Sequence, residues 1–280
     1  TSVYDNFFQG VGDILRLTNL RLYPKISFLM LVLGILWLYP NVWVAFTLMQ
    51  VAIFLTLFFV VDFRHLGPKS LGDESVRLTI EKTKTFGINV YLGSITFLAG
   101  IQCIPIAIAS ISSDNSYVGY YGLAMTLTSP LVMFPQIIST VFFRDFVSKD
   151  RIDKELIFLL LVVSVSVGSI LYFSGAFLIE GFFGEQYLPA VDFFEVLILF
   201  NVLHGINVFL DRFLHAKGAA KVLRDSYLLG GLTLFLTLFV FISQFDVIGV
   251  CWALLSSSAV SLAFKVSAYL SQNYKPESVL

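Results

Sequence analysis

Residues 156–179 read LIFLLLVVSVSVGSILYFSGAFLI, and this stretch decides what kind of fold the chain can have. It holds 24 residues and no charged side chain. As an α-helix it would be about 36 Å long, which exceeds the roughly 30 Å of a bilayer's hydrocarbon core. A strand of a membrane β-barrel would be only about 10 residues long and would alternate apolar with polar residues. The stretch therefore predicts a membrane-spanning α-helix.

The composition of the whole chain extends this prediction beyond one segment. Hydrophobic residues make up 57% of the 280 positions and charged residues 13%, and the mean hydropathy is +0.85. Soluble domains carry roughly 25% charged residues, so this balance argues against a water-soluble globular enzyme and against disordered, collagen-like or coiled-coil chains. We expect an all-α polytopic membrane protein whose surroundings are the lipid bilayer. The net charge of −1 gives no reason to expect a nucleic-acid partner.

Eight stretches are long and apolar enough to cross a bilayer, since a spanning helix needs about 20 residues. They lie at residues 22–39, 42–61, 86–111, 118–143, 156–179, 190–210, 227–243 and 247–270.

The charges predict how these spans are oriented. When the connections are assigned alternately to two sides, all 18 Lys and Arg residues fall on the same side. The opposite side holds the acidic residues Asp114, Glu180, Glu185 and Asp246 and no Lys or Arg. Under the positive-inside rule the basic side is cytoplasmic, so both termini of this chain are expected in the cytoplasm.

The connection at residues 62–85 is the longest between predicted spans and carries both charge signs together with Gly67, Pro68 and Gly72. We interpret it as a cytoplasmic linker between two lobes. Residues 1–61 would then be a cytoplasmic segment plus two spans of a first lobe. Residues 86–272 would form a second lobe of six helices, and residues 273–280 a cytoplasmic tail.

Three motifs that would indicate a nucleotide-binding, metal-binding or nucleophile site are absent from this sequence. The pattern GxxxxGK[ST] of a nucleotide-binding loop is absent, and so are HExxH and GxSxG. We therefore expect no catalytic residue, no metal site and no cofactor.

The predicted span at 190–210 is the most informative for function, because polar groups inside a bilayer are costly and usually face a cavity or another helix. At about 100° per residue, Asn201, His204 and Asn207 fall on one face, which continues to Asp211. The face predicts either the lining of a hydrated cavity or hydrogen bonds between helices. The residues alone do not choose between these two.

Two other predicted spans contain features typical of helices that bend. Pro105 interrupts 86–111, and Pro130 with Pro135 interrupts 118–143, which indicates kinks or gating positions near a substrate path. In the span 86–111, small residues repeat along one line and favour tight packing against a neighbour. Gln102 lies away from that line, beside Tyr91, and is a further candidate for the cavity.

Four stretches carry a family resemblance. Residues 117–147, YVGYYGLAMTLTSPLVMFPQIISTVFFRDFV, resemble the eighth-span region of Wzx-type polysaccharide flippases of the MOP superfamily. Residues 183–190, FGEQYLPA, resemble that family's FGxxYxxA loop, and residues 215–218, HAKG, resemble a short cytoplasmic turn. Residues 7–10, FFQG, resemble the start of the connection after the family's fourth span.

The resemblance implies a fold and a truncation. Family members have about 12 spans in two six-helix lobes, so this chain would lack the first four. Its second lobe would be complete.

The resemblance also implies a function, which is to move undecaprenyl-pyrophosphate-linked oligosaccharide repeat units, of O-antigen or another surface polysaccharide, across the bacterial inner membrane by alternating access. Asn201, His204, Asn207 and Gln102 would then hydrogen-bond the sugar. Tyr91 and Tyr121 would stack on sugar rings, while Arg144, Arg212 and Lys265 would meet the headgroup at the cytoplasmic side.

Partners implied by the resemblance are a polysaccharide polymerase and a chain-length regulator. Two alternatives stay open. One is a MATE-like multidrug or cation antiporter, and the other is a membrane enzyme of the same pathway, a polymerase or an acyltransferase.

Overall fold

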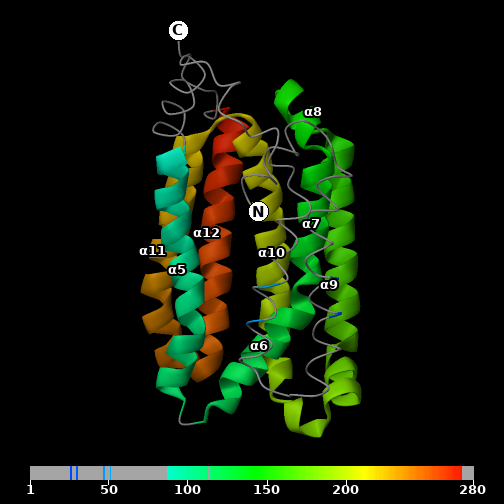
Figure 1. Ribbon diagram of the computed structural model, residues 1–280, viewed down its shortest axis with the longest axis vertical. Helices are drawn as coiled ribbons and strands as arrows, with labels where there is room; N and C mark the ends of the chain where they lie inside the picture. The colour runs from blue at the N-terminus through cyan, green and yellow to red at the C-terminus, as the bar shows by residue number, and fades with distance from the viewer. Residues whose placement is uncertain are drawn as a thin grey trace. The chain divides into compact units, whose positions relative to one another are not determined.

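A computed structural model of the chain describes residues 87–112 and 114–272, together with the isolated positions 26, 30, 47 and 51. Within the two ranges the chain forms helices and no strand. The helices, shown in Figure 1, are α5 (Ile88–Ile111), α6 (Ser116–Thr128), α7 (Pro130–Val141), α8 (Phe143–Ser148), α9 (Lys154–Phe183), η4 (Glu185–Tyr187), α10 (Ala190–Ala216), α11 (Ala220–Phe245), η5 (Asp246–Ile248) and α12 (Gly249–Ser271).

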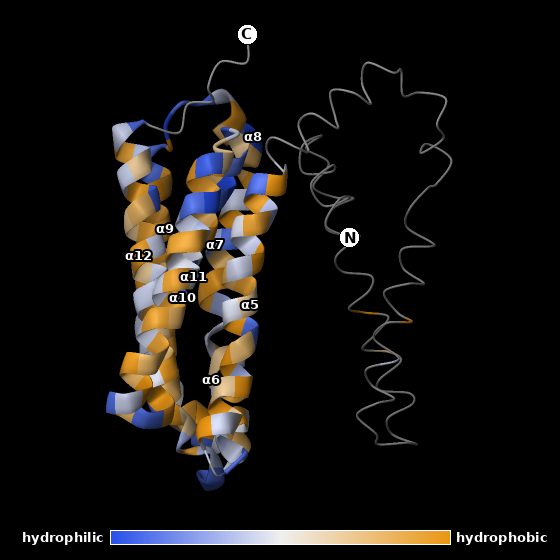
Figure 2. Ribbon diagram, turned by 90° about the vertical axis from the view of Figure 1, so that its left-hand side faces the viewer, coloured by the Kyte–Doolittle hydropathy of each residue, from blue (hydrophilic) through white to orange (hydrophobic). Residues whose placement is uncertain are grey.

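The prediction of an all-α membrane protein is confirmed. Five helical stretches are long and apolar enough to span a bilayer, and the last of them, at residues 220–271, comprises both α11 and α12. In Figure 2 the hydrophobic residues follow the length of the helices and the hydrophilic ones gather toward their ends. The predicted spans at 22–39 and 42–61, the linker at 62–85 and the tail at 273–280 lie outside the described residues, apart from four helical positions in the two spans.

The chain divides into two compact units, Thr1–Thr79 and Ile80–Leu280. In the second unit α10 is the central helix: 14 of its 27 residues are buried, against six of 30 in α9. It packs against α6, α7, α8, α9, α11 and α12, whereas α5 packs mainly against α11. The spans therefore form two groups joined through α10, with α5, α11 and α12 in one and α6, α7 and α9 in the other (Figure 1).

Helix ends follow local backbone rules. Gly184 closes α9 with a φ of +90°, and Gly218 separates α10 from α11 with a φ of +69°, conformations that side-chain-bearing residues rarely adopt. The helices run further than the apolar stretches predicted: α11 starts at Ala220 rather than 227. Lys221 and Arg224 are good helix formers, and the intervening Leu223 is buried, so the charged turn continues the helix.

The predicted span at 118–143 is divided at Ser129, where α6 ends and Pro130 begins α7. Proline lacks the N–H that would bond the carbonyl of Thr126. The hydroxyl of Ser129 donates to that carbonyl instead, at 2.8 Å. The break therefore leaves this backbone oxygen satisfied. Pro135 and Pro105 lie inside α7 and α5, which continue past them.

The small residues of α5 face α11 closely. A Cβ atom at Gly93 would lie 2.8 Å from the Cα of Arg224, and one at Gly100 would lie 2.8 Å from a methyl group of Leu234. The tight-packing interpretation of this face is confirmed at Gly93 and Gly100.

Candidate functional site

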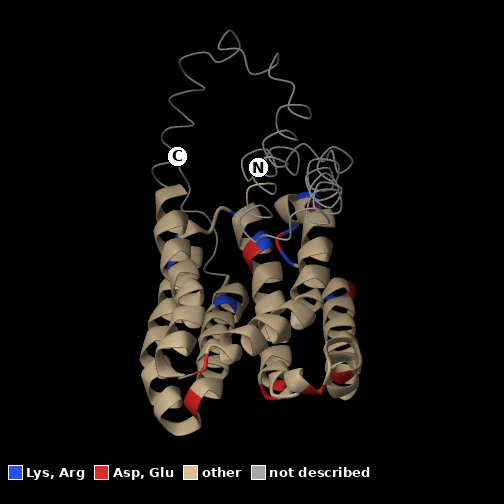
Figure 3. Ribbon diagram, turned by 60° about the horizontal axis from the view of Figure 1, so that its bottom comes forward, with Lys and Arg blue, Asp and Glu red and all other residues tan. Residues whose placement is uncertain are grey.

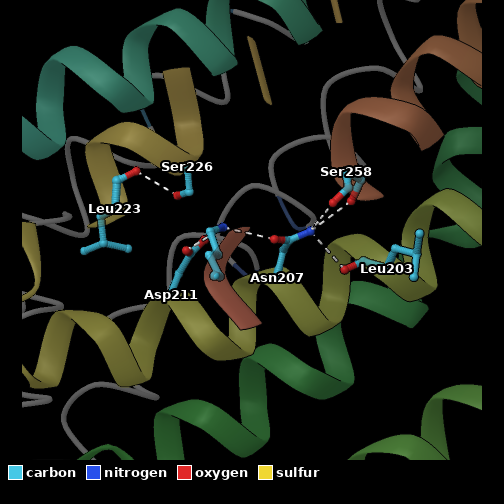
Figure 4. A network of polar contacts seen from close by, with 7 residues as sticks. Leu203, Asn207, Asp211, Leu223, Ser226 and Ser258 are labelled. Atoms are coloured by element: carbon cyan, nitrogen blue, oxygen red, sulfur yellow. Dashed lines mark hydrogen bonds and ion pairs between the residues drawn. The ribbon is translucent and has the colours of Figure 1, made fainter. Parts of the chain in front are cut away.

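A lysine is buried inside this membrane bundle. Lys265 of α12 is 1% exposed, and its Nζ lies 2.7 Å from Oδ1 of Asp211 on α10. The same ammonium donates a hydrogen bond to Oδ1 of Asn207, at 3.1 Å. The ring of Tyr227 on α11 lies 4.9 Å from Nζ, measured to its centroid. Three helices thus surround one charge, and Figure 4 shows this network around Asn207 and Asp211.

The amide of Asn207 has only one orientation that fits its surroundings. Its Nδ2 donates to the carbonyl oxygens of Leu203 and Ser258 and to the Ser258 hydroxyl, at 3.2, 2.9 and 3.0 Å. A flipped amide would place its NH₂ group against the Lys265 ammonium, where both are donors. The Oδ1 of Asn207 is therefore held toward the lysine.

The sequence brings Lys265 inward through the periodicity of α12. Its buried positions 254, 257, 258, 261, 265 and 268 repeat every three or four residues, so they share one face. Several of these are serines, and small residues let α12 approach its neighbours closely. The hydroxyl of Ser257 donates to the carbonyl of Gly230 on α11 at 2.7 Å, a contact that needs such an approach.

Lys265 was expected at the cytoplasmic end of its span, where it would meet a headgroup. It lies six residues before the end of α12 at Ser271, about 9 Å along the helix, and it is enclosed by protein. The expectation that Lys265 meets a headgroup does not hold in this conformation, because the side chain is enclosed by protein and Asp211 compensates its charge. The small-residue face of α12 was the signal that could have placed it.

Asn201 also belongs to α10, but its hydrogen-bond partner is not part of the Lys265 network. Its amide donates to the hydroxyl of Thr128 on α6 at 2.7 Å, and it is 3% exposed. Of the two interpretations of the polar face, hydrogen bonding between helices therefore describes Asn201 and Asn207.

His204 remains partly accessible. Its ring stacks on Phe200 of the same helix, with centroids 5.3 Å apart, and on Phe97 of α5 at 6.0 Å. These rings fix its orientation, and the contact with Phe97 joins side chains of α10 and α5.

The other sequence candidates are dispersed. Tyr121 lies in the apolar core and is only 5% exposed. A sugar cannot reach its ring in this conformation, so the predicted stacking role is wrong here. Tyr91 and Gln102 lie on exposed positions of α5. Arg144 is exposed on α8, and Arg212 is partly buried on α10, near His215 and Tyr227.

Sequence reasoning missed the partner of Lys265. Asp211 was expected at the cytoplasmic interface as the end of the polar face, and Tyr227 and Ser258 were not singled out. Pairing between α10, α11 and α12 depends on how the helices pack, which no local pattern contains. Among the described residues, no group of three or more His, Cys, Asp or Glu side chains could hold a metal ion.

Comparison with solved structures finds a similar arrangement of helices in several membrane transporters. An outward-facing MATE-family multidrug transporter of the MOP superfamily superposes with a TM-score of 0.54 at 17% identity, over 71% of this chain and 47% of that one. A MOP superfamily transporter from Pyrococcus furiosus, described as having a binding pocket of reverse polarity, gives 0.55 at 16% identity over the same shares. A MATE transporter in complex with MaD5 gives 0.55 at 17%, over 67% and 46%.

The described helices thus have the fold of MOP superfamily transporters, and the chain spans about half the length of the solved structures it matches. No family model matches the sequence. No curated protein matches it either.

Proposed function

We propose that this chain is part of a flippase that translocates a lipid-linked oligosaccharide, carried on undecaprenyl pyrophosphate, across the bacterial inner membrane. The transporter fold supports a role in membrane transport. The substrate class rests on the four sequence stretches that resemble Wzx-type proteins and on the electrostatics of the bundle.

The observation that carries the proposal is the neutral interior. An antiporter driven by cations needs a carboxylate that can bind and release them inside the membrane. Among the described residues, Asp211 has a carboxylate oxygen buried within the bundle, and Lys265 already neutralises this carboxylate at 2.7 Å. Asp192 and Glu195 of α10 lie on exposed positions. A neutral interior suits an uncharged sugar headgroup.

The accessible part of the polar face of α10 is the proposed contact surface for that headgroup. His204 is partly exposed, as are Asp211 and Arg212 further along the same helix. Imidazole and guanidinium groups donate hydrogen bonds, which sugar hydroxyls and phosphate oxygens accept. His204 would meet the sugar, and Arg212 the diphosphate near the cytoplasmic end.

The experiment begins with a deletion of the gene in its native host. Lipid-linked oligosaccharides are isolated, and the membrane face that exposes them is determined. Complete single repeat units trapped on the cytoplasmic face are expected. Incomplete units would identify an assembly enzyme instead, and single units trapped on the outer face a polymerase.

Complementation with two alanine variants then locates the contact surface. His204→Ala should reduce export about 10-fold or more at normal protein level, because it removes a partly exposed hydrogen-bond donor from the proposed contact surface. Asn201→Ala is the matched control on the same helix, since its amide is paired with Thr128. It should leave export near the wild-type level. Equal effects of the two substitutions would contradict the assignment.

A MATE-like multidrug or cation antiporter is the second candidate, favoured by the structural similarity to MATE transporters. Drug susceptibility of the same deletion strain separates the two. A normal oligosaccharide profile together with raised susceptibility would replace the flippase proposal by this one.

A further inference from the structure

The surroundings of the Lys265 ammonium are those of a cation site. Two oxygens, from the Asp211 carboxylate and the Asn207 amide, lie 2.7 and 3.1 Å from Nζ. The face of Tyr227 lies on another side, at 4.9 Å to the ring centroid. Carboxylate and amide oxygens are also the ligands of hard metal cations, and aromatic faces attract cations generally.

We propose that Lys265 is a tethered cation, which permanently occupies a site that would otherwise bind a monovalent metal cation, Na⁺ or K⁺. The inference holds whichever substrate the transporter carries. It assigns the site a ligand class, and it implies that the wild-type protein draws no metal cation from solution at this position.

The amide of Asn207 is held in one orientation by its own hydrogen bonds. Three hydrogen bonds from its Nδ2 fix Oδ1 toward the centre of the site, independently of the lysine. An acceptor aimed inward by its own helix and by α12 persists when the ammonium is removed. The site is therefore built by the bundle and not merely by the lysine that fills it.

The buried carboxylate of Asp211 needs a counter-charge. Its Oδ1 is buried, and the Lys265 ammonium lies 2.7 Å away as its counter-charge. A buried carboxylate that loses its counter-charge must acquire another cation or a proton, because an isolated buried charge is costly. Removing the lysine side chain beyond Cβ also leaves space for a metal ion with its remaining water ligands.

The site lies between the central helix and one of the two groups of helices. Asn207 and Asp211 belong to α10, Tyr227 to α11 and Lys265 to α12. A mobile cation here would make that contact depend on the ion gradient. A tethered ammonium keeps it intact at any concentration of Na⁺ or K⁺.

The test measures thermal unfolding of the purified full chain in detergent, in NaCl, KCl or choline chloride at equal ionic strength. For Lys265→Ala we expect the Tm to rise by about 5 °C or more in about 0.3 M NaCl or KCl relative to choline chloride. Lys265→Met, which keeps the stem's volume, serves if the alanine variant does not accumulate. The wild type should show no difference between the three salts.

The matched control is the double variant Lys265→Ala with Asp211→Asn, which should lose the preference for metal cations. Stabilisation of Lys265→Ala by acid alone would show that Asp211 takes a proton, and equal Tm values in all salts at every pH would show a purely structural pair. Either result overturns the proposal. The ionisable neighbours in the acid comparison are His204, His215, Arg212 and Tyr227. Because the readout is stability, neither failure bears on oligosaccharide export.

Discussion

Lys265 and Asp211 show how a single pair can decide the electrostatics of a membrane bundle. Each charge alone would be costly in this environment, and together they leave a neutral site lined by Asn207 and Tyr227. Asn201 is the uncharged counterpart on the same helix, because its amide reaches Thr128 at 2.7 Å. On α10, Asn207 and Asp211 thus surround the charge of Lys265, whereas Asn201 forms an uncharged contact with another helix.

Removing one member of the pair should be far worse than removing both. We expect Asp211→Ala to lower the free energy of unfolding by about 3–5 kcal/mol, because the Lys265 ammonium would stay buried without its counter-charge. Asp211→Leu combined with Lys265→Met should recover most of that loss. Denaturant titration in micelles of the single and double variants measures the coupling. Additive losses would show that the two residues act independently.

At the scale of elements, the crossing of α10 with α7 depends on Gly205. A Cβ atom there would lie 2.7 Å from the carbonyl oxygen of Leu131 and 2.9 Å from the ring of Pro135. That carbonyl is the one that loses its helical donor to Pro135, since proline has no N–H. The proline of one helix and the glycine of the other therefore meet at the same point.

Gly205→Ala should consequently lower the free energy of unfolding by about 1–3 kcal/mol, since the backbone of α7 has to move. Gly122 of α6 is the matched control, because a Cβ atom there meets nothing within 4 Å. Gly122→Ala should be neutral or should stabilise by up to about 1 kcal/mol through helix propensity. Thermal unfolding of both variants in one detergent is the measurement, and equal effects would refute the close crossing.

At the scale of the whole molecule, charge is distributed unequally between the two ends of the bundle. In Figure 3 acidic residues mark one end, and the described Lys and Arg residues lie away from it. The loop between α5 and α6 and the turns before α10 and before α12 carry Asp114, Glu185 and Asp246. Such a distribution predicts that these turns lie outside the cytoplasm.

Cysteine labelling tests this orientation. In a Cys103→Ser background, Gln186→Cys should react with a membrane-impermeant thiol reagent in intact spheroplasts, and Ser148→Cys should react only after permeabilisation. Both positions are exposed, and Cys251 is buried, so it should remain silent. The reverse pattern would invert the topology, including the predicted cytoplasmic location of both termini.

The sequence determined the class of fold because that class depends on local, additive properties. The uncharged stretch at 156–179 became the core of α9, and the break predicted by Pro130 occurs at Ser129. The small residues of α5 predicted close packing correctly, since spacing along a helix alone defines its face. Hydropathy, proline and helical periodicity each act within a few turns, so they can be read before the chain folds.

The tertiary structure alone decided which polar groups meet. Tyr121 lies in the apolar core, and Asn201 forms a hydrogen bond with α6. Lys265 lies inside the bundle because Asp211, 54 positions earlier in the chain, neutralises its charge. The energy of a buried charge depends on partners brought from other helices, and those distances are set by packing across the whole lobe. A span's residues predict that a helix crosses the membrane, whereas its neighbours decide what its polar face does.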